Sequence, residues 1–221
     1  MDGLPKSLVD IAEAEIRKLI VQGDLDLGQR VTESELAKRF GMSKTPVHEA
    51  LQHLQREGLV QVRPRQGTFI FTFTDELVQA LLGVRNVLET FALREAVRQN
   101  RGRLLRYLGE NMKQTLKIYE EGKIAPYFKL DRAFHFSFFD FADNQFLNAA
   151  YSAISIKTQV LWRLTFSSDD YTLDDVRLSL VDHQYIIENI HEEKLDAACG
   201  RLTQHMYRTQ QNYESFSGIP R

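Results

Sequence analysis

Residues 33–59, ESELAKRFGMSKTPVHEALQHLQREGL, contain two short helical patterns with a glycine between them. In the first pattern, the small Ala37 stands where a second helix has to cross closely. Gly41 follows at the point where a helix ends in the left-handed conformation, which costs glycine little. Val47 begins the apolar face of the second pattern. The spacing of these three residues predicts a tight helix-turn-helix.

A short β-hairpin is expected directly after this motif. Residues 60–62 and 68–73 are rich in β-branched and aromatic residues. Residues 63–67, RPRQG, lie between them and are rich in turn formers. We therefore predict two strands joined by a turn with basic residues at its tip, which is a wing beside the helix-turn-helix.

Side chains of this region suit contact with DNA. The first turns of a recognition helix reach base edges, and a basic wing reaches phosphates. Six Lys and Arg residues stand against two Glu between positions 38 and 65, although the whole chain has a formal net charge of −2. An ordinary helical hairpin with a solvated basic face is the alternative, and the basic wing favours DNA binding. The predicted DNA-contacting residues are Arg39, Ser43, Lys44, Thr45, His48, Gln52, Arg63, Arg65 and Gly67.

The remainder of the chain, from Asp75 to Tyr213, has helical spacing almost throughout. We expect six helices of about 15–25 residues. The fold class is therefore mainly α, with a winged helix-turn-helix domain at 1–73 and an all-α six-helix antiparallel bundle at 74–221. The helical pattern is interrupted near residues 100–102, 121–126, 142–144, 167–172 and 192–194.

Composition excludes several classes of protein. The single cysteine, Cys199, allows neither an intramolecular disulfide nor a cysteine-rich zinc site, and it fits a reducing cytoplasm. No apolar run approaches the roughly 20 residues of a membrane span. Acidic residues within the first thirty positions argue against a signal peptide. We expect a cytoplasmic protein with no membrane partner.

One carboxylate and three histidines have spacings that suit a metal site. Asp131 and His135 are four residues apart, so both point to one face of a helix. His183 and His205 lie about nine residues on either side of a turn near residues 192–194, and an antiparallel helix pair would put their imidazoles at the same depth. Three imidazoles and a carboxylate suit zinc, nickel, manganese or another divalent transition metal. The alternative is that each histidine is a core residue bonded to a carbonyl.

Two parts of the chain resemble one known family. Residues 33–71 resemble the winged-helix domain of the GntR family of bacterial transcription regulators, whose members usually carry arginine at the positions of Lys44 and His48. Residues 75–214 resemble the all-helical FCD effector domain of its FadR branch. The metal-binding subset of that branch has Asp-x₃-His, then His, then His. The resemblance implies that Asp131, His135, His183 and His205 are the metal ligands.

The resemblance also implies an organic-acid effector. In the family, an arginine at the position of Arg85 often meets the carboxylate of the effector, and a guanidinium beside a metal would neutralise such a ligand. An internal pair between Arg85 and Glu89 is the alternative and would contribute little on a surface. Asn144 and Arg163 are further candidate effector-binding residues.

These features predict a homodimeric transcriptional regulator, a repressor by resemblance. It would bind double-stranded operator DNA and release it when a small organic acid binds at the metal and shifts the population of conformations. A metal-responsive regulator without an organic effector is one alternative, and a structural scaffold would not need the basic wing. A metal-dependent hydrolase or lyase is another, but no H-E-x-x-H motif accompanies the histidines, so we do not expect an enzyme.

Overall fold

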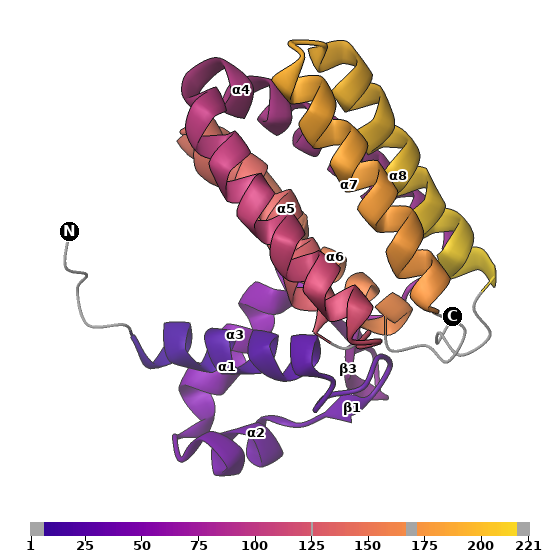
Figure 1. Ribbon diagram of the computed structural model, residues 1–221. Helices are drawn as coiled ribbons and strands as arrows, with labels where there is room; N and C mark the ends of the chain where they lie inside the picture. The colour runs from indigo at the N-terminus through magenta and orange to yellow at the C-terminus, as the bar shows by residue number, and fades with distance from the viewer. Residues whose placement is uncertain (1–6, 125, 167–171, 216–221) are drawn as a thin grey trace. The chain divides into compact units, whose positions relative to one another are not determined.

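The computed structural model describes residues 7–124, 126–166 and 172–215, without the side chains of residues 209, 210 and 212–215 (Figure 1). Its internal contacts divide the chain after Thr74 into two compact units. Each unit is described by itself below.

The first unit is a winged helix, as the sequence predicted. Leu36 and Ala37 of α2 are buried, and so are Val47 and Leu54 of α3, so the two helices share an apolar core. Its helices are α1 (Leu8–Gln22), α2 (Glu33–Phe40) and α3 (Lys44–Arg56), and its strands are β1 (Arg30–Val31), β2 (Val60–Arg63) and β3 (Gly67–Ile70).

Local signals fix the start and end of α2. The Thr32 hydroxyl accepts a hydrogen bond from the Glu35 amide, and the Glu35 carboxylate accepts one from the Thr32 amide, which together form a capping box. At the other end Gly41 has φ +67°, and the amide of Met42 donates to the carbonyl of Ala37 over 3.1 Å. This left-handed termination directs the chain into α3, as the helix-turn-helix requires.

The wing contains one strand more than predicted. The sheet is antiparallel in the order β1-β3-β2, whereas the sequence indicated a hairpin of two strands. β1 has two residues, too few to show an alternating pattern. β3 ends at Ile70 rather than Phe73, and Phe71 and Phe73 are both buried beyond it. The prediction was wrong in these details because aromatic residues favour a strand and a core position equally.

The second unit consists of helices only, and the predicted fold class is confirmed. Asn100 interrupts α4 with φ −143°, so α4 comprises two helical segments, and the described part of this unit contains the six segments that were expected. The predicted interruption at residues 167–172 lies, except for Thr172, outside the described residues. The helices are α4 (Asp75–Glu120), α5 (Tyr127–Ala142), α6 (Gln145–Phe166), α7 (Leu173–His191) and α8 (Leu195–Ser215).

Apolar side chains from α4, α5, α6, α7 and α8 form the core of this unit. Leu93, Phe134, Phe138, Ile186 and Leu202 are all fully buried within it. Each such side chain contributes about 1.5–3 kcal/mol through burial. In Figure 1, α7 and α8 lie side by side as a helical hairpin. None of the described helices is long and apolar enough to span a bilayer.

Candidate metal centre and nucleic-acid interface

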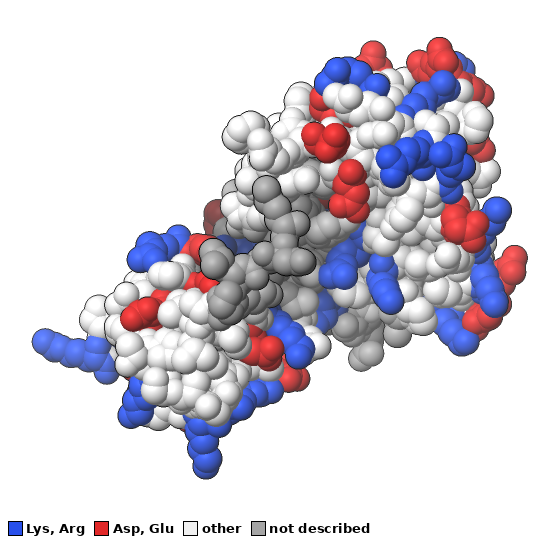
Figure 2. All heavy atoms as spheres, turned by 90° about the vertical axis from the view of Figure 1, so that its left-hand side faces the viewer, with Lys and Arg blue, Asp and Glu red and all other residues white. Residues whose placement is uncertain are grey.

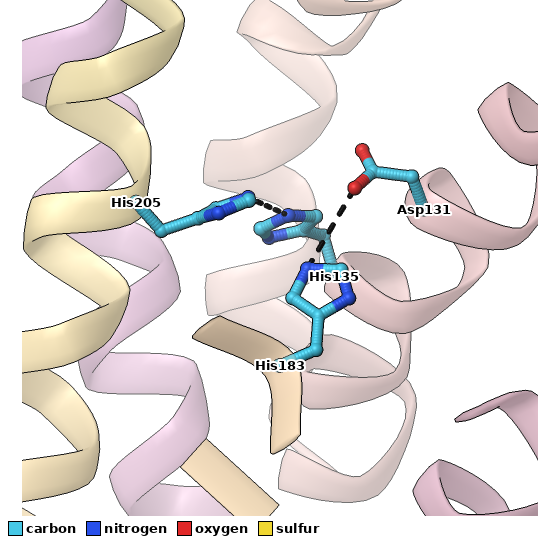
Figure 3. Close-up of side chains that lie close together, drawn as sticks. All are labelled: Asp131, His135, His183 and His205. Atoms are coloured by element: carbon cyan, nitrogen blue, oxygen red, sulfur yellow. Dashed lines mark hydrogen bonds and ion pairs between the residues drawn. The ribbon is translucent and has the colours of Figure 1, made fainter. Parts of the chain in front are cut away.

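Four polar side chains meet inside the apolar core of the helical unit. Asp131 and His135 come from α5, His183 from α7 and His205 from α8, and all four are buried. One potential ligand atom from each lies within 4.8 Å of the others. Figure 3 shows the side chains converging from three helices. The structure thus brings together the four residues that the sequence nominated as metal ligands.

The imidazoles of His135 and His205 face each other through their Nε2 atoms, which are 3.2 Å apart. Their Nδ1 atoms face carboxylates: that of His135 lies 2.7 Å from Glu89, and that of His205 lies 3.1 Å from Asp182. A carboxylate that accepts the Nδ1 hydrogen leaves the lone pair on Nε2. Two ligand atoms on a tetrahedral zinc ion, with bonds of about 2.0–2.1 Å, are separated by about 3.3 Å. The pair therefore fits a shared cation.

His183 and Asp131 complete the cluster. The Nε2 atom of His183 is 3.6 Å from Oδ1 of Asp131, which is too long for a hydrogen bond, and among the described residues it has no hydrogen-bond partner. The ring of His183 stacks on Phe134 with centroids 3.7 Å apart, so its orientation is fixed. The hydroxyl of Tyr127 donates to the same Asp131 oxygen over 2.7 Å. A buried nitrogen without a partner beside a carboxylate also fits a metal ligand set.

Burial favours the neutral form of His183 and His135. Burial lowers the pKa of His183 well below its usual value, and the charges of His205, His135 and Arg85 act in the same direction. Burial also lowers the pKa of His135, although Glu89 opposes this shift. Neutral imidazole is the form that binds a metal ion, so His183 and His135 would not first have to lose a proton at neutral pH.

Arg85 and Glu89 form an ion pair inside the core. The Nε atom of Arg85 donates to Glu89 over 2.5 Å, and the side chains are only 1% and 0% exposed. Burial by itself would raise the pKa of Glu89, but the charge of Arg85 and the hydrogen bonds from Arg85 and His135 lower it to about 2. The guanidinium lies over the ring of Trp162, 4.4 Å from its centroid, and its Nη2 atom is buried without a hydrogen-bond partner among the described residues. The pair of Arg85 and Glu89 that the sequence offered as an alternative is present, but it lies in the core and not on the surface.

The other two candidate effector residues lie elsewhere on the helices. The Oδ1 atom of Asn144 accepts hydrogen bonds from the amides of Phe146 and Leu147, both over 3.1 Å, so Asn144 caps α6. Asn144 lies beyond the C-terminal end of α5, the helix that carries His135, because that helix ends at Ala142. Arg163 is partly exposed and follows the buried Trp162 on α6. Asn144 is therefore a capping residue outside the cluster.

The candidate recognition helix α3 presents the predicted polar residues to solvent. Lys44, Thr45, His48 and Gln52 are exposed. The Nδ1 atom of His48 lies 2.7 Å from a carboxylate oxygen of Glu33, and its Nε2 atom lies 2.9 Å from the amide nitrogen of Gln52. Both ring nitrogens of His48 are thus engaged within this unit. Ser43 is the N-cap residue of α3 and is exposed, but its side chain makes no capping hydrogen bond.

The wing also keeps basic side chains at its surface. Arg63 lies over the ring of Phe69 at 4.5 Å, and Arg65 occupies the tip with φ +62°. Gly67 has φ +120°, and a Cβ there would lie 2.7 Å from Nε of Arg30. Figure 2 shows Lys and Arg side chains projecting outward from the winged-helix unit. Arg39 of α2 is also exposed, and it pairs with Asp24 over 2.9 Å.

Comparison with protein families gives two matches. The model for bacterial regulatory proteins of the gntR family covers residues 8–70, and the model for the FCD domain covers residues 80–208. A protein of Paenarthrobacter nicotinovorans, named as the probable D-xylose utilization operon transcriptional repressor, is 30% identical over 93% of this chain and 91% of its own length. This chain belongs to the GntR family. It carries the FCD domain that the resemblance of residues 75–214 implied.

Other GntR-type regulators agree with this assignment. The HTH-type transcriptional repressor RspR of Escherichia coli is 26% identical over 86% of this chain and 82% of its own length. Among solved structures, E. coli McbR/YncC matches with a TM-score of 0.76 at 19% identity and covers 95% of this chain and 99% of its own, which shows the fold alone. The chain is a transcriptional regulator of the GntR family, and its relatives are regulators rather than enzymes.

Three residues that contribute to the metal cluster or to the wing were not predicted from the sequence. Asp182 holds His205 although it adjoins His183 in the sequence, and Glu89 holds His135 from 46 positions away. Only the tertiary structure reveals these contacts. Arg30 was missed because its strand, β1, was not predicted, yet it is exposed beside Gly67 in the wing.

Proposed function

We propose that this GntR-family regulator is a homodimeric transcriptional repressor whose operator affinity is set by a small carboxylate bound at a divalent metal in the FCD domain. One observation carries the metal part: two buried Nε2 atoms, 3.2 Å apart, each belong to an imidazole whose Nδ1 faces a carboxylate. Zinc, nickel and manganese all accept imidazole and carboxylate ligands.

Asp131 and the Nε2 atoms of the three histidines would hold the ion. The metal would supply a positive charge and, in a five- or six-coordinate geometry, an open coordination position for a ligand oxygen. Glu89 and Asp182 fix the orientation and tautomer of His135 and His205, as residues behind metal ligands do. The unpartnered Nη2 atom of Arg85 supports the carboxylate part of the proposal, since a buried guanidinium hydrogen gains most from an anionic acceptor.

The regulatory step would be a shift between two conformations of the dimer. A ligand changes operator affinity only by its difference in affinity for the two states. Operators read by helix-turn-helix dimers have two half-sites about one DNA turn apart, so a change in the spacing of two copies of α3 alters binding. The repressor name of the P. nicotinovorans relative supports repression as the sign of regulation.

A regulator that responds to the metal alone is the second candidate. The ion pair of Arg85 with Glu89 favours it, because the guanidinium charge is already balanced inside the protein. In that case no organic acid would be needed, and the metal itself would set the arrangement of α5, α7 and α8.

Operator binding separates the two candidates. We expect a small carboxylate, from a panel of two- to six-carbon mono- and dicarboxylates, to weaken operator binding by metal-loaded protein by about tenfold or more, as measured by fluorescence anisotropy. In Arg85→Lys the response should shrink, because lysine keeps the charge but loses the fork of donors. A full response to metal without any carboxylate would establish the second candidate, and no response to either would contradict both.

Lys44 at the start of α3 should contact a phosphate or a base edge. Lys44→Ala is expected to weaken operator binding and to reduce the slope of log affinity against log salt by about one. Lys113→Ala removes the same charge from the exposed surface of α4 and serves as the control. An unchanged salt slope in Lys44→Ala would remove Lys44 from the DNA interface.

A further inference from the structure

The FCD domain also has a pocket, and none of the four cluster residues is among the described residues that line it. It has a volume of about 330 Å³ and lies between α4 and α8. Its apolar part is formed by Leu82 and Met206, which are almost fully buried. Gly83 contributes no side chain, and a Cβ placed there would meet no atom within 4 Å. This volume is at the lower end of small-molecule sites, which run from about 300 to 1,000 Å³.

Neutral polar groups line the rest of this pocket. The hydroxyl of Thr203 donates to the side-chain oxygen of Asn86 over 2.9 Å, which leaves the Asn86 amide hydrogens available to a ligand. Gln79 offers a second amide, and Tyr207 offers an aromatic face and a hydroxyl. Among the described residues, the lining contains no Lys, Arg, His, Asp or Glu.

The pocket shares only α8 with the metal cluster, and α4, its other helix, carries none of the four cluster residues. Asn86 follows Arg85, so the two side chains point about 100° apart around α4. Thr203 precedes His205 by two residues, so they point about 160° apart around α8. The lining residues and the cluster residues therefore have no member in common.

We propose that this pocket binds a small uncharged polyhydroxylated molecule of about monosaccharide size. A carboxylate or ammonium group would lose its hydration there without meeting an opposite charge. Amide and hydroxyl groups both donate and accept hydrogen bonds, so they match the hydroxyls of a polyol. The apolar floor and the ring of Tyr207 suit the C–H face of such a ligand. This ligand differs in chemistry from the carboxylate proposed for the metal.

Calorimetric titration of the full-length, metal-loaded protein tests the proposal. The probes are D-ribose, ribitol and D-glucose, with D-ribonate as the charged counterpart. Gly83→Leu would place a side chain in the pocket, whereas Gly83→Ala adds only the Cβ, for which there is open space. We expect at least one neutral probe to bind wild type and Gly83→Ala alike, and to bind Gly83→Leu at least about tenfold more weakly. Metal content should be equal in all three proteins.

Three results would overturn the proposal: no neutral probe binds wild type, D-ribonate binds as tightly as D-ribose, or Gly83→Leu binds with undiminished affinity. Thr203→Val provides a second variant that keeps the side-chain shape and loses the hydroxyl. It should weaken binding even if Gly83→Leu does not fold, and full affinity in Thr203→Val would count against the site. Binding here needs no metal ligand, so failure of the metal proposal would leave this result unaffected.

Discussion

His183→Ala is expected to lose most of the metal that the wild-type protein carries. Three ligand atoms would remain of the four that converge in the core. Loss of a residue behind a metal ligand already lowers affinity by about 10- to 100-fold, so loss of a ligand itself should exceed that range. Elemental analysis after dialysis against metal-free buffer measures the effect.

His191→Ala is the matched control for this experiment. His191 is the last residue of α7, the helix that also carries His183, but it is exposed. Its replacement should leave the metal content unchanged. If His183→Ala retains as much metal as His191→Ala, then His183 is a core histidine and the proposed ligand set is wrong.

Glu89→Ala is expected to cause the largest loss of stability in the helical unit, about 3–5 kcal/mol. The substitution leaves the buried guanidinium of Arg85 without its carboxylate and removes the acceptor that faces His135. A buried charge that loses its partner pays the full cost of its lost hydration. Urea denaturation of the metal-free protein measures the free energy of unfolding without a contribution from metal binding.

Glu95→Ala provides the comparison on the same helix. Glu95 pairs with Arg98 over 2.7 Å, but that pair lies at the surface. Such pairs contribute less than about 1 kcal/mol. Equal and small losses in the two variants would show that the pair of Arg85 and Glu89 is not the buried network described above. Glu89→Gln, which keeps the shape of the side chain, should fall between the two.

The parts of the structure that depend on local sequence could be predicted. Helix-turn-helix geometry follows from Ala37, Gly41 and Val47, because close helix crossing and a left-handed helix end each require a small residue. β1 could not be predicted, because a strand of two residues forms only where β3 offers it a partner. The helical unit was predictable as helices because its apolar spacing is regular over most of its length.

The cluster was predictable in its ligands but not in their supporting contacts. His183 and His205 are placed almost symmetrically about one turn, and helix geometry then brings them together. The same spacing describes Arg85 and Glu89 whether their helix face is exposed or buried, so sequence could not reveal that this pair lies in the core. Asn144 was predicted to bind the effector, although asparagine just before a helix favours an N-cap. The N-cap is the position that Asn144 occupies.

The central claim is that three helices of the FCD domain hold one divalent cation through Asp131, His135, His183 and His205. Anomalous diffraction from crystals of the full-length protein, recorded at the absorption edge of the metal found by elemental analysis, tests it most directly. We expect an anomalous peak within bonding distance, about 2.0–2.2 Å, of the three Nε2 atoms and one Asp131 oxygen. Metal-loaded crystals with no peak between these residues, or with a peak bound elsewhere, would contradict it.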